Sequence, residues 1–207
     1  MPEKVGLQDV PRQSNGEETR SLRSSADGLK HLARNQTPVC EPPTSPGPFT
    51  FFSAAEIARG QLVELLNQTF VGTLDCPALN ELRTPEEFMD SFLHDRDLTD
   101  DLQWYVATVG EELAGCLFLT PLAEELMEIT YLGLRPQFRQ RGYGRYLVEH
   151  ARNLATSRGA KMLLTAVDAN NLPAVRIYRR GGFQVLQRMS VYLAGRVGQS
   201  RGYAWAM

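Results

Sequence analysis

The chain has 207 residues, of which 43% are hydrophobic and 22% charged, a composition typical of a globular protein with one domain of ordinary size. Its 22 basic and 24 acidic side chains give a formal net charge of -2, which excludes the positive field that a binder of nucleic acids or anionic membranes needs. No run of about 18 apolar residues is present and the N-terminus lacks the apolar stretch of a secretory signal, so we expect a cytoplasmic protein with no nucleic-acid or membrane partner.

Residues 1–48 differ in composition from the rest of the chain. They contain seven of the 12 prolines, clusters of polar residues and few apolar side chains. Such a segment buries too little apolar surface to offset the cost of ordering it, about 1–2 kcal/mol per residue. We therefore predict a disordered Pro/Ser-rich arm and linker over residues 1–48 and one domain over residues 49–207. A short helix over residues 22–33 is the alternative for part of the arm.

The first half of the domain shows alternating strand and helix signals. Residues 49–52 predict a strand, and Ser53-Ala54-Ala55-Glu56 matches a capping box that opens a helix. Thr84-Pro85-Glu86-Glu87 repeats this signal with a proline at the first helical position. Residues 104–109 and 113–119 are separated by a short turn and predict a β-hairpin.

The second half predicts a βαβ unit. Residues 127–134 have a strand pattern, residues 145–158 an amphipathic helix pattern, and residues 162–167 form an apolar run typical of a strand buried on both faces. Residues 171–180 and 183–193 predict a short helix and a closing strand. We therefore predict an α/β fold with a mixed, mostly antiparallel sheet, flanking helices and one parallel pair of strands.

The three cysteines, Cys40, Cys76 and Cys116, do not form a recognisable framework. They are odd in number, with no CxxC spacing and no histidine pair nearby. This pattern favours free thiols and speaks against a zinc site, so we expect no metal.

The strongest chemical signal is the segment Arg139-Gln140-Arg141-Gly142-Tyr143-Gly144, between a predicted strand and a long helix. Glycines let the backbone approach a ligand closely, and free N–H groups at a helix start favour a phosphate. Arginines add charge-assisted hydrogen bonds. Neither the Rossmann nor the Walker glycine spacing fits. Taken alone, the segment is equally typical of an ordinary glycine turn.

Four motifs follow one another in the second half of the chain. They are Glu128-Ile129-Thr130-Tyr131-Leu132-Gly133-Leu134-Arg135-Pro136, Arg139-x-x-Gly142-x-Gly144, Asn171-x-x-Ala174-x-x-x-Tyr178 and Gly182-Phe183. Together they resemble the GCN5-related N-acetyltransferase (GNAT) superfamily. The resemblance covers residues 49–207 in architecture and 127–183 in motif, and it implies a GNAT-type sheet whose βαβ unit binds acetyl-CoA as co-substrate.

The resemblance also implies which residues bind acetyl-CoA. In the superfamily the glycine loop cradles the pyrophosphate with its backbone, and the preceding strand is splayed from its neighbour and offers free backbone groups to the pantetheine. Transferred to this sequence, the implied cofactor-binding residues are Leu132, Gly133, Leu134, Arg139, Gln140, Arg141, Gly142, Tyr143, Gly144, Arg145 and Asn171.

Acetyl transfer to an amine needs a base, because an alkyl amine is protonated at pH 7 (reference pKa about 10.4). Glu128 matches the position at which histone-acetylating members of the superfamily carry their general base. Burial at this position would raise its pKa toward neutrality. The structural alternative is a solvated glutamate at a strand entrance, since Glu124 and Glu125 are acidic neighbours.

The departing CoA thiolate needs a proton, which a phenol with a pKa of about 10 can donate. Tyr178 matches the general acid of the superfamily, with Asn171 at the expected spacing before it. The alternative for Tyr178 is an aromatic core residue on a short helix. Backbone N–H groups around Leu132 can stabilise the developing oxyanion.

The sequence says less about the residues that bind the acceptor amine. By resemblance to the fold, residues 70–83 wall the acceptor site, and the acidic residues Asp95, Asp97, Asp100 and Asp101 follow nearby. Their negative charge would favour a cationic amine, although a solvated acidic loop explains any one of them. Cys76 lies in the wall and has no histidine to activate it, so a structural thiol is the better interpretation.

The leading hypothesis is therefore an acetyl-CoA-dependent N-acetyltransferase that acts by direct attack in a ternary complex. Its acceptor would be a small-molecule or peptide amine. One alternative is a catalytically silent acyl-CoA-binding sensor or interaction module, and another is the same fold with a longer acyl-CoA donor. The closing strand and the tail over residues 195–207 offer a surface for a homodimer.

Overall fold

The computed structural model describes residues 26–35, 47–77, 83–93 and 103–191. The strands are β1 (Ala26–Asn35), β2 (Thr50–Ser53), β3 (Gln103–Val109), β4 (Glu112–Ala123), β5 (Leu126–Leu134), β6 (Met162–Asp168) and β7 (Gln184–Val191). The helices are α1 (Arg59–Phe70), α3 (Pro85–Leu93), α4 (Gly144–Ser157) and α5 (Leu172–Arg180), with short 3-10 turns η1 (Ala54–Glu56) and η2 (Pro136–Phe138). In these ranges no helix is long and apolar enough to cross a membrane.

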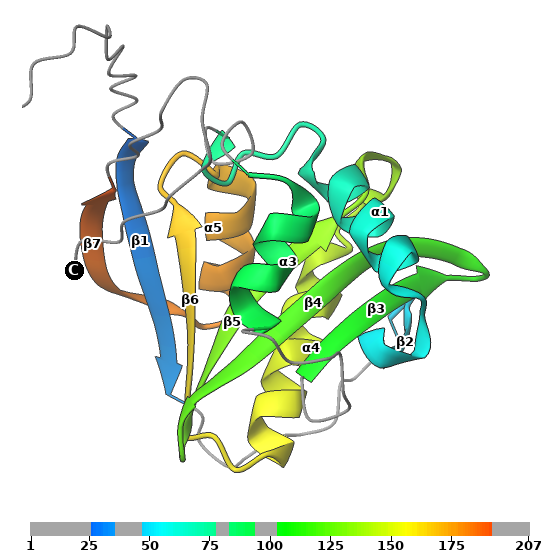
Figure 1. The fold of residues 1–207 in the computed structure, drawn as a ribbon. Coiled ribbons are helices and arrows are strands. Elements are labelled where there is room, and N and C mark those ends of the chain that lie inside the picture. The colour runs from blue at the N-terminus through cyan, green and yellow to red at the C-terminus, as the bar shows by residue number, and fades with distance from the viewer. Residues whose placement is uncertain (1–25, 36–46, 78–82, 94–102, 192–207) are drawn as a thin grey trace, which may run out of the picture.

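The strands form one seven-stranded sheet in the order β2-β3-β4-β5-β6-β1-β7 (Figure 1). Only β5 and β6 pair in parallel, and the other paired neighbours are antiparallel. The helix between the two parallel strands is α4, so β5, α4 and β6 form the predicted βαβ unit. The prediction of a mixed, mostly antiparallel α/β sheet is confirmed.

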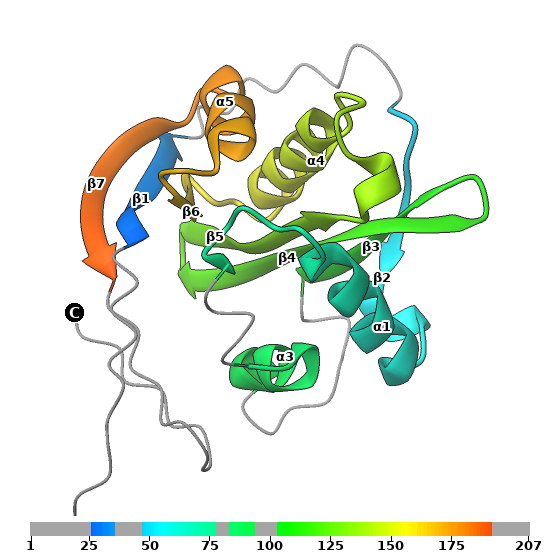
Figure 2. The ribbon, with the colours of Figure 1, turned by 90° about the horizontal axis from the view of Figure 1, so that it is seen from above.

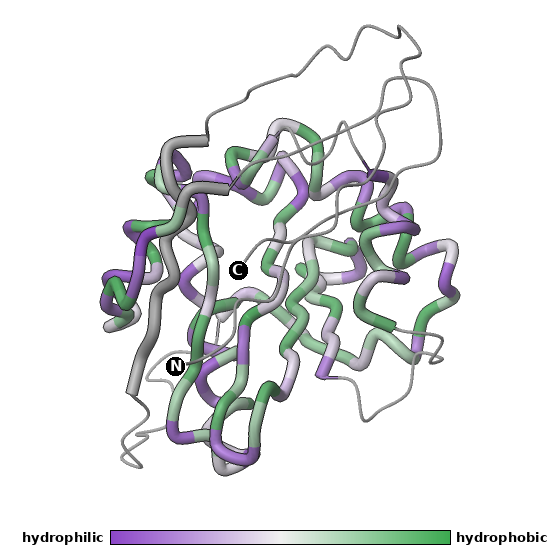
Figure 3. The backbone as a smooth tube through the Cα atoms, turned by 60° about the vertical axis from the view of Figure 1, so that its left-hand side comes forward, coloured by the Kyte–Doolittle hydropathy of each residue, from purple (hydrophilic) through white to green (hydrophobic). Residues whose placement is uncertain are grey.

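Helices cover both faces of the sheet. Figure 2 shows α4 and α5 on one face and α1 and α3 on the other. Each pair of helices closes an apolar core, because neighbouring strand residues alternate between the faces: Leu117 packs on the α4 side and Phe118 on the α1 side. Figure 3 shows hydrophobic colour along the central strands and hydrophilic colour at the turns that join them.

The two predicted capping boxes form, but only one of them opens a regular helix. At Thr84 the backbone N–H donates to Glu87 Oε2 (2.7 Å), and the Glu87 N–H donates to Thr84 Oγ1 (3.2 Å), at the start of α3. At Ser53 the box opens only η1, and α1 begins separately at Arg59. The prediction of one continuous helix is wrong here because Ile57 is extended, with φ -113° and ψ 154°, and interrupts the chain of helical residues.

The arm contains a strand, which differs from the disordered arm predicted for residues 1–48. β1 lies between β6 and β7 and is paired with both, from Leu29 opposite Asp168 to Asn35 opposite Met162 on the β6 side. The prediction is wrong for residues 26–35, and so is the alternative of a helix. Apolar content is a poor guide to such a segment, because backbone hydrogen bonds to two neighbours order a strand of polar composition. Residues 1–25 and 36–46 lie outside the described ranges.

Candidate active site

The central feature of the site is the opening between β5 and β6. The two strands are paired from Leu126 opposite Met162 to Ile129 opposite Thr165, and the register between them ends there. β5 nevertheless continues to Leu134 along β4, and β6 continues to Asp168 along β1. The edges of β5 and β6 that face each other are therefore free of strand pairing beyond Ile129, as the resemblance implied.

A β-bulge marks the place where the strands separate. On β4, Phe118 lies opposite Tyr131 and the next residue, Leu119, lies opposite Ile129, so Thr130 is the extra residue of β5. Ile129 and Leu132 consequently pack on the same core, although alternation would place them on opposite faces. The bulge lies two residues before Leu132, around which the oxyanion donors are predicted, and at the place where β5 and β6 part.

The loop between η2 and α4 has the geometry of an anion-binding turn. Gln140 and Gly142 have positive φ values, 59° and 74°. In the part of the chain that the structure describes, no backbone partner is recorded for the N–H groups from Gln140 to Tyr143. Free N–H groups directly before a helix, with the helix dipole behind them, favour a negatively charged group. The two charged side chains that follow, Arg141 and Arg145, are exposed.

Glycine is favoured at two positions of the loop, 142 and 144, for different structural reasons. A Cβ at Gly142 would meet no atom within 4 Å, so its positive φ is what favours glycine there. A Cβ at Gly144 would lie 2.8 Å from Ile177 Cδ1, so the lack of a side chain lets α4 approach α5.

The side chain of Arg139 is engaged with the protein backbone. Its Nε donates to the carbonyl of Leu134 (2.8 Å) and its Nη2 to that of Thr69 (2.7 Å). Its Nη1 donates to the carbonyls of Val71 (2.7 Å) and Gly72 (3.2 Å). Arg139 therefore ties the end of β5 and the loop to the last turn of α1. No sequence motif signals this link, because its partners are about 70 residues away along the chain.

Glu128 lies on β5 one residue before the strands separate. It is opposite Leu164 of β6 and Thr120 of β4, and its side chain is half-buried. Burial raises the pKa of its carboxyl above the usual range. No hydrogen bond or ion pair is recorded for it within the described ranges, whereas the neighbouring Glu125 is bound to Lys161 Nζ (2.6 Å). The structure thus brings Glu128, and not Glu125, to the opening in a form suited to accept a proton.

Tyr178 reaches the same place from the other side. It is buried on α5 and packs edge-on against Phe183, and the side chain of Thr165 lies close enough to its phenol to offset part of the rise in pKa that burial causes. Thr165 Oγ1 in turn donates to the carbonyl of Ile129 (3.3 Å), the last paired residue of β5. Burial raises the pKa of the Tyr178 phenol, and the charge of Asp75 adds to the rise. The phenol is therefore neutral at pH 7 and can donate a proton.

The predicted acceptor wall is described as far as residue 77 and again from Arg83. Asp75, on the loop after α1, accepts a hydrogen bond at Oδ1 from the backbone N–H of Asp168 (2.7 Å). Asp168 Oδ2 accepts one from the N–H of Cys76 (3.3 Å). Sequence reasoning did not single out Asp168, although an acidic residue directly after the buried run of β6 is a usable signal. The four aspartates predicted to add charge, Asp95, Asp97, Asp100 and Asp101, lie outside the described ranges.

Cys76 is half-buried, and burial raises the pKa of its thiol to about 12, with further rises from the charges of Asp75 and Asp168. A thiol with this pKa is not a nucleophile at neutral pH. This supports the structural interpretation of Cys76.

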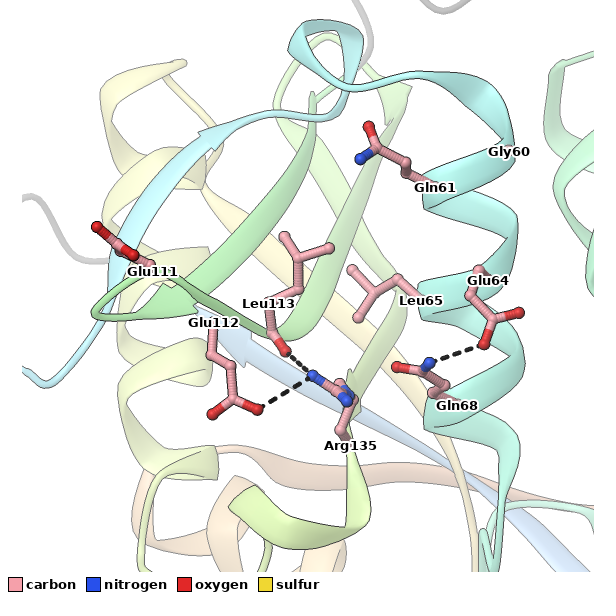
Figure 4. A pocket seen from close by; sticks show the side chains of 9 residues that line it. All are labelled: Gly60, Gln61, Glu64, Leu65, Gln68, Glu111, Glu112, Leu113 and Arg135. Carbon is pink, nitrogen blue, oxygen red and sulfur yellow. Dashed lines mark hydrogen bonds and ion pairs between the residues drawn. The ribbon is translucent and has the colours of Figure 1, made fainter.

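A separate depression lies outside the opening. It has a volume of about 400 Å³ and is formed by α1, the turn of the β3–β4 hairpin and Arg135 (Figure 4). Arg135 Nη1 donates to the carbonyl of Leu113 (2.7 Å) and lies 3.7 Å from Glu112 Oε1. None of the residues predicted for catalysis or for cofactor binding lines this depression.

The sequence of this chain matches one family model, described as the acetyltransferase (GNAT) family, over residues 59–183. The chain belongs to the GNAT acetyltransferase family. The matched GNAT region contains the opening, the glycine loop, Glu128 and Tyr178.

Curated relatives of this GNAT chain include a mycothiol acetyltransferase of Corynebacterium glutamicum strain R, 36% identical over 40% of this chain and 28% of that protein. A peptidyl-lysine N-acetyltransferase of Salmonella typhimurium is 34% identical over 51% of this chain and 63% of that protein. The chain thus spans less than a third of the mycothiol acetyltransferase that it matches.

Among solved structures, a GCN5-related N-acetyltransferase from Sphaerobacter thermophilus aligns with a TM-score of 0.56 at 19% identity, covering 85% of this chain and 55% of that chain. A GNAT acetyltransferase from Elizabethkingia anophelis with acetyl-CoA bound aligns with a TM-score of 0.50 at 20% identity, covering 68% of this chain and 78% of that chain. At these identities the likeness shows a shared fold.

Proposed function

We propose that this chain transfers an acetyl group from acetyl-CoA to a primary amine by direct attack in a ternary complex. The observation that carries the proposal is the opening between β5 and β6, with Glu128 beside its apex and the buried Tyr178 phenol near Thr165 at the apex. The relatives named as a mycothiol acetyltransferase and a peptidyl-lysine N-acetyltransferase differ in acceptor, so we infer the class of acceptor from the residues of this site.

The described residues fit acetyl-CoA as the donor. The free N–H groups from Gln140 to Tyr143 suit a pyrophosphate, and the unpaired edge of β5 from Leu132 to Leu134 can hydrogen-bond an amide-containing arm. When bound, acetyl-CoA supplies an activated acyl group. Arg139 binds other backbone carbonyls with its side chain, so its part in donor binding falls to the backbone.

The residues of the chain then divide the proton transfers between them. Glu128 takes a proton from the ammonium of the acceptor, which frees the nitrogen lone pair to form the new C–N bond. Backbone N–H groups near the bulge at Thr130 stabilise the carbonyl oxygen as it gains charge. The C–S bond breaks, and Tyr178 gives its proton to the leaving sulfur. The nitrogen loses its second proton as the neutral amide forms, and this proton returns the Tyr178 phenolate to a phenol, while the proton held by Glu128 passes to solvent. An ammonium and a thioester thus give an amide, a thiol and one released proton.

Acidic groups at the opening favour a cationic acceptor. Glu128 lies beside the apex, Asp168 lies at the carboxyl end of β6, and Asp75 is hydrogen-bonded to Asp168. A negative field of this kind raises the local concentration of an ammonium relative to a neutral or anionic substrate. We therefore propose an alkyl amine, of a small molecule or a peptide, as the acceptor.

The test is an amine panel with two readouts, release of the CoA thiol and the mass of the acetylated amine. The parent should acetylate at least one alkyl amine, and Glu128→Gln should lower the rate by roughly 10²–10⁴ while acetyl-CoA affinity is kept. Since burial raises the pKa of Glu128, the acidic limb of the parent pH profile should lie above the usual range of a glutamate and should be absent from the variant. Glu125→Gln is the matched control and should keep the parent rate and profile.

Two outcomes would contradict the proposal. Tight binding of acetyl-CoA without transfer to any amine would favour a silent binding module. Transfer that is faster from longer acyl-CoA donors than from acetyl-CoA would keep the fold and the mechanism but change the donor.

A further inference from the structure

Two loops that are far apart in the sequence are joined at the open end of the site. One is the loop after α1, which holds Asp75 and Cys76, and the other is the turn from β6 to α5, which follows Asp168 at the end of β6. The Asp168 N–H donates to Asp75 Oδ1 (2.7 Å), and the Cys76 N–H donates to Asp168 Oδ2 (3.3 Å). Each carboxylate thus binds a backbone N–H of the opposite loop, and we call this reciprocal pair the aspartate clasp.

The clasp holds one residue in a conformation that it would not adopt freely. Cys76 has φ 43°, in the left-handed region, and its N–H is the group that Asp168 accepts. This conformation is unfavourable for a non-glycine residue, which adopts it stably only when surrounding contacts hold it there. The bond from Cys76 to Asp168 is such a contact, so the clasp defines the shape of the acceptor wall at this point.

The clasp continues into the start of α5. Asp168, the partner of Asp75, also binds the residues that open this helix: its Oδ1 accepts the N–H of Asn170 (2.8 Å), and its carbonyl accepts the N–H of Asn171 (3.0 Å). Asn171 is the N-cap of α5, and its Oδ1 accepts the N–H of Ala174 (3.3 Å). Asp75 is therefore linked to the cap of α5 through Asp168.

Tyr178 lies seven residues after the N-cap Asn171, about two turns into α5. Because the helix carries the Tyr178 ring against Phe183, a shift of the helix start moves the phenol relative to the opening. Although Asp75 is exposed as a residue, its carboxylate faces this region, where burial raises its pKa and its charge acts on Tyr178. Asp75 thus acts on Tyr178 through its charge and, by way of Asp168, through the start of α5.

We propose that Asp75 is a positioning residue for the proton donor, holding Tyr178 at the opening through Asp168 and the N-terminus of α5. The proposal rests on the proposed function of Tyr178 as the acid. It assigns the loop after α1 a part in catalysis in addition to its place in the acceptor wall: the loop that borders the acceptor also sets the helix that protonates the leaving group.

The experiment compares Asp75→Ala with Thr73→Ala. Thr73 Oγ1 accepts the N–H of Asp75 (3.1 Å) within the same loop, and no contact between Thr73 and the β6–α5 turn is recorded in the described ranges, so it is a matched control. Amide hydrogen exchange is measured first, without any substrate. Asp75→Ala should speed exchange at Ala174 and Val175 about tenfold and leave α4 unchanged, whereas Thr73→Ala should leave both helices unchanged.

Kinetics then test the route through Tyr178. We expect Asp75→Ala to lower kcat about tenfold with acetyl-CoA affinity kept, and to lower it no further in a Tyr178→Phe background. Equal losses in both backgrounds, a change in the KM for the amine alone, or unchanged exchange at Ala174 would overturn the inference. If Asp75→Ala does not fold, Asp75→Asn removes the charge and keeps an acceptor for the Asp168 N–H, and the same comparisons apply.

The proposed function and the positioning role of Asp75 can be contradicted separately. A Tyr178→Phe variant with the full parent rate would remove Tyr178 from the proposed function, whatever hydrogen exchange shows. Normal dependence on Tyr178 together with unchanged exchange in Asp75→Ala would leave the proposed function standing and remove the positioning role of Asp75.

Discussion

A half-buried histidine should make the stability of this fold depend on pH. His150 on α4 stacks on Phe51 with ring centroids 3.7 Å apart and an interplanar angle of 4°, and Tyr105 meets it edge-on at 5.5 Å. Its Nε2 is buried without a hydrogen-bond partner in the described ranges. Burial lowers the pKa of His150 from its usual 6.5 to about 4.

The sign follows from the direction of the shift. A histidine whose pKa is lowered by folding binds protons more readily in the unfolded chain, so its contribution to stability is complete above about pH 6.5 and is lost as pH falls from there toward 4. With these two values, the free energy of unfolding decreases by about 2 kcal/mol between pH 7.5 and pH 5. His150 is only partly buried, so solvent screening makes this figure an upper bound.

The assay is urea unfolding of the parent and His150→Phe at pH 7.5 and pH 5. Phenylalanine keeps the aromatic stack and removes the unpaired nitrogen, so the variant should be at least as stable as the parent at pH 7.5 and should lose less stability at pH 5. The difference between the two proteins is the relevant quantity, because the raised pKa values of Asp75 and Glu128 act on both in the opposite direction. Equal losses in parent and variant would refute the reasoning.

Three further predictions concern the frame of the site. Gly115→Ala should lower the free energy of unfolding by about 1–3 kcal/mol in urea titrations, because the new Cβ would lie 2.2 Å from the Gly133 carbonyl oxygen. The control Gly60→Ala should not destabilise the chain, because a Cβ there would meet no atom within 4 Å. Arg139→Gln should lower the free energy of unfolding by about 2 kcal/mol. Arg139→Lys should not restore it, because a lysine lacks the planar guanidinium that bonds four separate carbonyls; full recovery of stability with lysine would contradict this explanation. Removing residues 1–35 should lower Tm by several degrees, because β1 is lost from between β6 and β7, whereas removing residues 1–25 should not. Equal Tm values for the two truncated proteins would show that β1 does not contribute to stability.

Local sequence signals predicted the βαβ half of the molecule well. The pattern of residues 127–134, 145–158 and 162–167 corresponds to β5, α4 and β6 within a few residues. Glu128 and Tyr178 were named from motif spacing, and the structure brings both to the opening. These features are legible because each depends on residues close together in the chain.

The features that sequence reasoning missed depend on distant partners. Arg139 was assigned to the donor loop by its backbone, and its sequence context did not reveal that its side chain binds the end of α1, about 70 residues away. Asp75 was named only as part of the acceptor wall, and its partner Asp168 lies 93 residues further along. β1 was missed because its order comes from pairing with β6 and β7, which its own composition does not reveal.

The central claim, that the loop before α4 binds acetyl-CoA, is tested most directly by calorimetry with two glycine variants. Gly142 and Gly110 both have positive φ, 74° and 61°, and in both a Cβ would meet no atom within 4 Å, but Gly110 lies in the β3–β4 turn. Gly142→Asp adds negative charge where the pyrophosphate should lie, so it should weaken acetyl-CoA binding more than tenfold, while Gly110→Asp should bind as the parent does. Equal affinity of Gly142→Asp and the parent would contradict the account.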